Sequence, residues 1–148
     1  MINSLRKSER LKHRKKIDEL FKSGKSFSIY PLRIYYKVES FNSVITDQQG
    51  LAHGLRPRPG VLAGVGVSKR HFRKAVDRNR IKRLLRESYR TQKHGLTGLV
   101  DSLQIRVDLF LIYTGRELPG LEICEKATGQ SLEKLQRLLF EKPQTPII

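Results

Sequence analysis

The spacing of apolar residues predicts three helices in this chain. Apolar positions within 9–23 recur at roughly helical intervals, with Ser8 before them as an N-cap and Gly24 after them as a stop signal. Two further helices are predicted within 70–92 and over 131–142, each with one apolar stripe. The stripe residues of the three helices are Leu11, Ile17, Leu20 and Phe21, then Ile81, Leu84, Leu85 and Ser88 or Tyr89, then Leu132, Leu135, Leu138 and Leu139.

The clearest strand signal is an alternation over residues 32–38. Successive side chains of a strand point to opposite faces of the sheet. One face would carry Leu32, Ile34, Tyr36 and Val38, and the other would carry Arg33, Tyr35 and Lys37. The pattern predicts one face buried in the core, Tyr36 included, and one face that combines cations with an aromatic ring.

Three other segments complete the predicted sheet. A short strand at 25–29 precedes the alternating one, and Pro31 marks the break between them. Residues 61–68 predict a buried strand whose valines alternate with glycine and serine, so that one face is nearly bare, and 104–113 predict a strongly apolar strand. The order α-β-β-β-α-β-α predicts an α+β fold, a two-layer sandwich of one sheet with helices packed on it.

A length of 148 residues suits one domain, which we expect to span 1–148. Residues 40–60 are rich in Gly, Pro, Gln and Asn and predict a loop insertion, and 143–148 predict a flexible tail. Because the sequence contains neither a signal-peptide pattern nor a long apolar run, we expect no membrane association and a cytoplasmic location. The single cysteine, Cys124, fits a reducing compartment and is expected to be a small buried residue.

Charge changes this picture of an ordinary small domain. The chain has 30 Lys and Arg against 14 Asp and Glu, a formal net charge of +16. Residues 1–25 contribute +6 and 69–93 contribute +9, whereas 94–148 are close to neutral at −1. So much like charge repels itself, which indicates a polyanionic partner. The two basic segments can form one binding surface only if the fold brings them together.

The densest charge lies in "DRNRIKRLLRESYR", residues 77–90. On a helix, Arg78, Lys82 and Arg86 would stand four apart along one face, and Arg80, Arg83 and Arg90 would fill the neighbouring surface. Pairing of Glu87 with Arg83 is expected to relieve part of the repulsion. Arginine binds phosphate in a bidentate manner, so this helix predicts a nucleic-acid contact rather than a merely solvated face.

The same stretch carries a family resemblance. "DRNRIKRLLRESYR", with "GVSKR" just upstream, resembles the Arg-Asn-Arg motif of the protein subunit of bacterial ribonuclease P. "RLKHRKKIDELFKSGKSF" is similar to that family's first helix and Gly turn, "VDLFLIY" to its fourth strand and "SLEKLQRLL" to its closing helix. The resemblance covers about residues 5–142 in the right order.

The resemblance implies a subunit of an endoribonuclease. With ribonuclease P RNA as its partner, the protein would assist removal of the 5′ leader from precursor tRNA, and the fold would include a left-handed crossover around the motif helix. The residues implied to bind the RNA subunit are Lys69, Arg70, Arg78, Asn79, Arg80, Lys82, Arg83 and Arg86. The residues implied to line a leader-binding cleft are Phe21, Arg33, Tyr35 and Lys37. Phe21 is either a stacking platform or a core residue.

No constellation in the sequence predicts that the protein itself is the catalyst. The four histidines lie far apart without metal-ligand spacing, and neither a nucleophile–base pair nor a phosphate loop is present. We therefore expect no catalytic residue and no metal site in the protein, with the chemistry carried by Mg²⁺ bound mainly to the RNA subunit. The resemblance implies no protein partner.

Two features leave alternatives open. Ile17 stands where the family often has an aromatic residue, which would weaken stacking at that point of the cleft. Composition alone also fits a non-catalytic RNA-binding module, of the ribosomal-protein or RNA-chaperone type. A DNA-binding regulator is a weaker alternative, because no second short helix precedes the basic one at helix-turn-helix spacing.

Overall fold

The computed structural model describes residues 9–40 and 60–141. The predicted loop insertion and tail lie almost entirely outside these described residues, as does Ser8, the predicted N-cap. In chain order the elements are α1 (Arg14–Ser23), β1 (Lys25–Ile29), β2 (Leu32–Ser40), β3 (Gly60–Val67), α4 (Ala75–Gln92), α5 (His94–Leu103), β4 (Ile105–Tyr113) and α6 (Leu121–Glu141).

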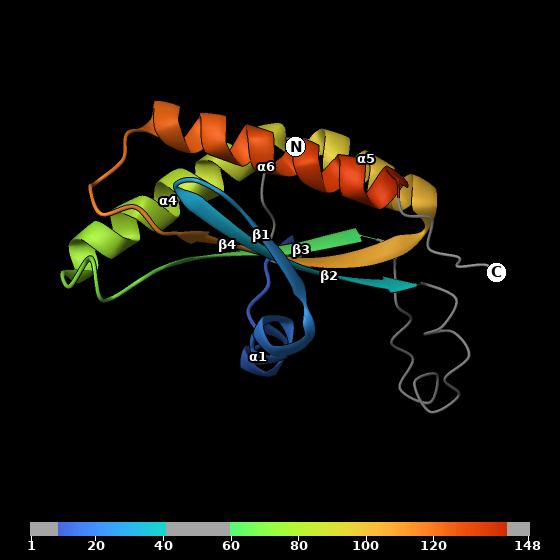
Figure 1. Ribbon diagram of the computed structural model, residues 1–148, viewed down its shortest axis with the longest axis horizontal. Coiled ribbons are helices and arrows are strands. Elements are labelled where there is room, and N and C mark those ends of the chain that lie inside the picture. Colours follow the sequence, from blue (N-terminus) through green and yellow to red (C-terminus); the bar gives the residue numbers. More distant parts are fainter. Residues whose placement is uncertain (1–8, 41–59, 142–148) are drawn as a thin grey trace.

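One four-stranded mixed sheet separates two helical layers. The strand order is β1-β2-β4-β3, with β3 and β4 parallel and the other neighbours antiparallel. Helices α4, α5 and α6 cover one face of the sheet, and α1 lies against the other (Figure 1). The predicted α+β architecture is therefore confirmed. The connection from β3 to β4 crosses over through α4 and α5; its left hand stays a prediction.

The main core lies between the sheet and the three covering helices. The predicted alternation of β2 is confirmed: Leu32, Ile34 and Tyr36 are buried in this core. Alternate residues of β4 and the predicted stripe of α4 meet them, with Ile81 and Leu85 fully buried. The opposite face of β2 carries Arg33, Tyr35 and Lys37, as predicted.

The first helix is shorter than predicted because its first residues pair with the sheet instead. Arg10 forms an isolated parallel bridge with Ala63 of β3, and the Leu11 N–H donates to the Ala63 carbonyl oxygen at 2.9 Å. Leu11 is buried there rather than on the helix. The helix starts at Arg14, with His13 in the N-cap position.

Two helical features were missed in the sequence. Helix α5 was not predicted, because Gly95 and Gly98 lower the helical propensity of a short segment. Helix α6 starts ten residues before its predicted beginning. Its first turns bury small side chains, Cys124, Ala127 and Thr128, which do not form a visible apolar stripe. Burial raises the pKa of Cys124 to about 11, as expected of a packed thiol.

Candidate nucleic-acid interface

Three aromatic side chains, Phe21, Tyr35 and Phe110, form a group on the sheet face that α1 covers. The rings of Phe21 and Tyr35 lie 4.8 Å apart, centroid to centroid, in an edge-to-face arrangement, and the Phe21 ring lies 5.3 Å from that of Phe110. These distances are typical of favourable aromatic pairs. Phe21 is nevertheless 41% exposed. Phe21 is thus not a core residue. Its ring packs against Tyr35 and Phe110 on one side and is open to solvent on the other.

Phe110 is a member of this group that the sequence analysis missed. It lies on the face of β4 that also carries Arg106 and Asp108, opposite the buried face of Val107 and Leu109. The sequence analysis read this strand only as strongly apolar and did not use that alternation. The Phe110 ring covers β3, where a Cβ atom on Gly64 would come within 2.7 Å of it and one on Gly66 within 2.8 Å. The nearly bare face of β3 is therefore the space that Phe110 fills.

A cation adjoins the aromatic group. The Arg33 Nε donates to the Tyr35 hydroxyl at 3.0 Å, and the Arg33 guanidinium carbon lies 5.4 Å from the Tyr35 ring centroid. A second nitrogen of Arg33 lies 3.4 Å from the Ser26 hydroxyl on β1. These contacts hold an exposed guanidinium beside an aromatic ring. That combination of charge and stacking surface suits single-stranded nucleic acid.

Lys37 lies farther along the same face of β2, where its register partner is Asp108 of β4. The carboxylate is buried, and its Oδ1 has no hydrogen-bond partner among the described residues. Burial raises the pKa of Asp108, although the charges of Lys16, Arg106 and Lys37 act in the opposite direction. The buried Asp108 carboxylate thus lies close to Lys37, Lys16 and Arg106 on this face of the sheet.

The predicted basic stripe lies along α4. Asn79, Arg80, Arg83 and Arg86 are exposed, Arg78 and Lys82 are half-buried, and Lys69 and Arg70 are exposed in the turn after β3. The Arg78 guanidinium differs from its neighbours because it donates to the carbonyl oxygens of Phe72 and Arg73. Glu87 does not pair with Arg83 as expected. It pairs with Arg90 at 2.6 Å, and this hydrogen bond lowers the pKa of Glu87.

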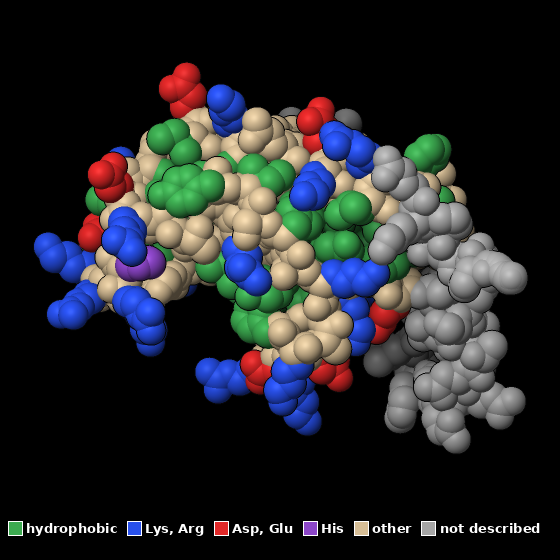
Figure 2. Space-filling model, in the orientation of Figure 1, with side chains coloured by type: hydrophobic (Ala, Val, Ile, Leu, Met, Phe, Trp, Pro, Cys, Tyr) green, Lys and Arg blue, Asp and Glu red, His purple; other side chains and the backbone are tan. Residues whose placement is uncertain are grey.

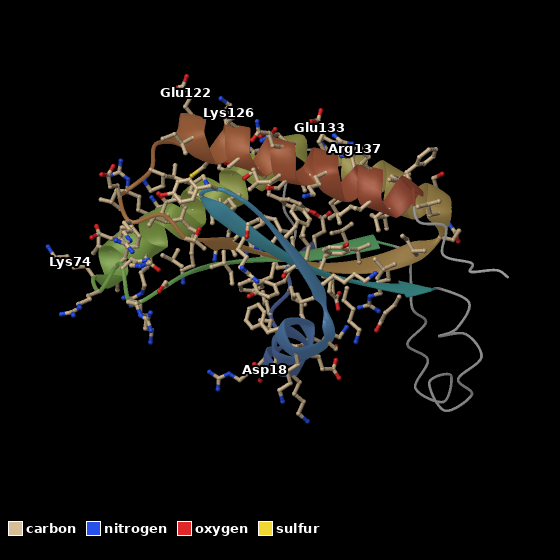
Figure 3. All side chains as sticks on the ribbon, viewed as in Figure 1. Asp18, Lys74, Glu122, Lys126, Glu133 and Arg137 are labelled. Carbon is tan, nitrogen blue, oxygen red and sulfur yellow. The ribbon has the colours of Figure 1, made fainter. Side chains whose placement is uncertain are left out.

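The cationic side chains gather on one side of the molecule. Figure 2 shows a concave stretch of surface between two groups of Lys and Arg side chains, one around the start of α4 and one around α1. On the far side, α6 carries charges of both signs that point away from the sheet, Glu122, Lys126, Glu133 and Arg137 (Figure 3). A polyanion is therefore attracted to the α1 and α4 side rather than to α6.

Metal-ligand clusters and membrane-spanning helices are both absent from the described residues. Within residues 9–40 and 60–141, no group of three or more His, Cys, Asp or Glu side chains could hold a metal ion. Over the same ranges, no helix is both long and apolar enough to span a bilayer.

The sequence matches the family model described as Ribonuclease P over residues 5–135. The chain belongs to the ribonuclease P protein family. The ribonuclease P protein component of Porphyromonas gingivalis strain W83 is 37% identical over 131 residues, which cover 88% of this chain and 85% of that one. Its counterpart in Chlorobium phaeobacteroides is 30% identical over 142 residues, or 91% and 90% of the two chains.

A solved ribonuclease P protein shares the fold. The structure of the Staphylococcus aureus RNase P protein superimposes with a TM-score of 0.59 at 18% identity, covering 87% of this chain and 95% of the other. The family model and the two relatives confirm the resemblance inferred from the Arg-Asn-Arg motif, and the shared structure confirms the α+β fold.

Membership of the ribonuclease P protein family relates both the aromatic sheet face and the basic stripe of α4 to one RNA-processing complex. The chain is a protein component of a bacterial endoribonuclease complex. Of the four residues predicted for the cleft, Phe21, Arg33 and Tyr35 come together, and Lys37 lies two positions beyond Tyr35 on the same face. The eight residues predicted to bind the RNA subunit lie in α4 and in the turn before it. Their roles in this ribonuclease P protein remain predictions.

Proposed function

We propose that the chain binds ribonuclease P RNA through α4 and holds the 5′ leader of precursor tRNA on the sheet face beneath α1. The observation that carries the proposal is the pairing of Phe21 and Tyr35 beside Arg33. Lys and Arg side chains around α1 and around the start of α4 flank one concave stretch of surface (Figure 2). A leader strand needs a stacking surface and phosphate neutralisation, and this face offers both. The RNA subunit needs dense positive charge, which α4 offers.

The protein would contribute binding and positioning rather than chemistry. Arg33 and Lys37 would neutralise leader phosphates while Tyr35 and Phe21 stack on bases, which fixes the strand relative to the RNA bound at α4. Mg²⁺ held by the RNA subunit would activate water for the phosphodiester cut. Cations of the protein would also reduce the repulsion between the two RNAs, so less Mg²⁺ would be needed to bring them together. We place this activity in the cytoplasm, in keeping with a tRNA-precursor substrate.

The test is reconstitution with the cognate RNA subunit at low Mg²⁺. Cleavage of a leader-bearing precursor tRNA is followed with and without the protein, across a Mg²⁺ series. We expect the protein to lower the Mg²⁺ concentration that half-maximal cleavage requires. If cleavage is the same with and without the protein at every Mg²⁺ concentration, the chain is instead an RNA-binding module without a part in this reaction.

A further inference from the structure

The segment just before α1 passes the outer edge of β3 and is fastened there at two points. The Glu9 carboxylate accepts a hydrogen bond from the Lys93 ammonium, and the two side chains form an ion pair. Two residues further on, the Leu11 N–H donates to the Ala63 carbonyl oxygen of β3. We call residues 9–11, together with Lys93, the clasp. The clasp connects the helical layer that contains α4 with α1 on the opposite face of the sheet (Figure 1).

The ion pair of the clasp is anchored in the interior at one end. The Lys93 side chain is 5% exposed, whereas that of Glu9 is 34% exposed. Lys93 lies between two helices, because it directly follows α4 and directly precedes α5. A buried ammonium is costly without an opposite charge, so Lys93 holds the Glu9 carboxylate in place. The segment before α1 is thereby tied to a residue 84 positions later in the sequence.

The start of α1 has little local support of its own. His13, in the N-cap position, makes no capping hydrogen bond with its side chain, and the first turn contains no acidic residue. Arg14, Lys15 and Lys16 stand there instead, at the positive end of the helix dipole, which disfavours cations. The helix has 10 residues, fewer than the roughly 12–15 at which an isolated helix becomes marginally stable. The position of α1 must therefore come from its contacts with the rest of the fold.

Packing on the sheet fixes α1 mainly near its end. Of the ten residues of this helix, all of which the structure describes, only Leu20 is buried. The Gly24 N–H donates to the Leu20 carbonyl oxygen, and β1 begins at the next residue. The last turn of α1 is thus held by a buried side chain and by a strand of the sheet. The first turn, two residues after Leu11, depends on the clasp.

The clasp also meets the aromatic group at Gly64 of β3. A Cβ atom on Gly64 would lie 3.1 Å from the Leu11 carbonyl oxygen and 2.7 Å from the Phe110 ring. The backbone of the clasp and the ring that supports Phe21 therefore pack on the same bare stretch of β3. A shift of the clasp would displace α1 there and separate Phe21 from Phe110 and Tyr35.

We propose that Glu9 and Lys93 are positioning residues for the leader, because they hold the start of α1 and thereby keep the Phe21 ring against Tyr35. This inference rests on the leader site proposed above, and it needs no contact between either residue and RNA. Since Lys93 directly follows α4, the pair also fixes the helix that would hold the leader relative to the helix that would bind the RNA subunit.

The first measurement follows the geometry of the rings in the protein alone. Lys93→Met replaces the buried ammonium with a flexible apolar side chain that fills the space. Lys126→Met, at an exposed position of α6, loses the same charge and is the matched control. The nuclear Overhauser effects between the Phe21 and Tyr35 rings, whose centroids lie 4.8 Å apart, should weaken strongly in Lys93→Met and persist in Lys126→Met. Unchanged effects in Lys93→Met would overturn the proposal.

The second measurement compares precursor and mature tRNA in equilibrium titrations of the assembled holoenzyme. Lys93→Met should weaken binding of precursor tRNA by roughly three- to tenfold, a part of the full effect of base stacking, and leave mature tRNA unchanged. Glu9→Gln should act in the same direction. The double variant should bind little worse than Lys93→Met, because the two residues act through one pair. Equal losses for the two tRNAs, or the same loss in Lys126→Met, would contradict a positioning role.

Glu9→Gln decides the question if Lys93→Met does not fold, because Glu9 is the more exposed partner. Its ring contacts and its titrations are then judged by the same criteria. If the unaltered holoenzyme binds precursor and mature tRNA equally well, the proposed leader site falls, and the ring contacts alone decide whether the clasp positions Phe21. If the unaltered holoenzyme favours precursor tRNA but neither variant changes the ring contacts, the leader site stands and the positioning role falls.

Discussion

The Arg78 guanidinium closes the turn that precedes its own helix, with Nη1 3.0 Å from the backbone carbonyl oxygen of Phe72. The same nitrogen lies 2.7 Å from the carbonyl oxygen of Arg73. Arg80, two residues along, is exposed and makes no hydrogen bond to another described residue. The Arg-Asn-Arg motif therefore contains one arginine that supports the fold and one that is left to a partner.

Replacement of these two arginines should separate stability from binding. Arg78→Ala should lower the free energy of unfolding by about 1 kcal/mol, because a hydrogen bond from a charged donor contributes about 1.5–3 kcal/mol and less where water reaches it. Thermal melting should show a loss of roughly 2–4 °C. Arg80→Ala should melt like the unaltered chain, while both variants bind the RNA subunit more weakly. Equal melting temperatures for the two variants would contradict a structural role for Arg78.

Tyr35 should matter for the leader and not for the rest of the tRNA. Stacking of a base on an aromatic ring contributes about 1–3 kcal/mol. Tyr35→Ala should thus weaken binding of precursor tRNA to the holoenzyme by roughly five- to a hundredfold. Mature tRNA, which has no leader, should bind as before. Tyr35→Phe is the control, because it keeps the ring and loses only the hydroxyl that Arg33 contacts.

Equilibrium titrations with the two tRNAs decide this point. Equal losses for precursor and mature tRNA, or no loss for either, would leave Tyr35 as a packing partner of Phe21 rather than a contact with the leader. An effect on binding of the RNA subunit would likewise contradict the separation of the two surfaces.

Binding of the RNA subunit should depend steeply on salt. Each phosphate that the protein neutralises releases condensed counterions. Contact with about five phosphates would give a slope of roughly −3.5 to −4.5 in a plot of the logarithm of the binding constant against the logarithm of the salt concentration. Titrations at four or five salt concentrations measure the slope. A nearly flat response would show that the basic surface is not the interface.

Because the Asp108 carboxyl group is buried, we predict an unusual pH dependence of the stability of the folded protein. Burial raises its pKa, so the folded protein holds the proton more tightly than the unfolded chain does. The protonated Asp108 side chain therefore contributes its full stabilisation below the unfolded-state pKa of about 3.9. This stabilisation is lost as the pH rises through the higher pKa of the folded state. Asp108→Asn, which is neutral at every pH, should melt roughly 1–3 °C higher than the unaltered chain at pH 7. The two should converge toward pH 4.

Melting curves from pH 4 to pH 8 measure this difference. Asp101→Asn, which removes one carboxyl group at an exposed position of α5, is the matched control. A less stable Asp108→Asn variant at pH 7 would mean that attraction from Lys16 and Lys37 outweighs the cost of burying the carboxylate.

The parts of the site that local pattern determines were predictable from the sequence. The alternation of β2 placed Arg33 and Tyr35 on one face because the period of a strand is fixed by its backbone. The stripe of α4 followed equally from helical spacing. Both signals lie within a few residues and need no knowledge of the rest of the chain.

The missing parts depend on neighbours distant in sequence. The alternation of β4 puts Phe110 on the face of Arg106 and Asp108, but the strand alone does not reveal that Gly64 and Gly66 of β3 make room for its ring. Leu11 fits the periodicity of the first helix, yet its N–H pairs with Ala63. The segment just before α1, residues 10–12, meets α4 near Arg86 where that pairing holds it against β3. Helical and strand periodicity carry no information on such contacts.

The place of β4 in the sheet has a consequence for how the chain folds during synthesis. β4 is the last strand to be made, yet it lies between β2 and β3 and pairs with both. Until about residue 113 has left the ribosome, the β1–β2 hairpin and β3 share no partner, and an isolated hairpin is at best marginally stable. Pairings of such long range are slow to form. The basic segments are therefore synthesised well before the sheet that organises them, and the nascent chain exposes unpaired strand edges during that interval.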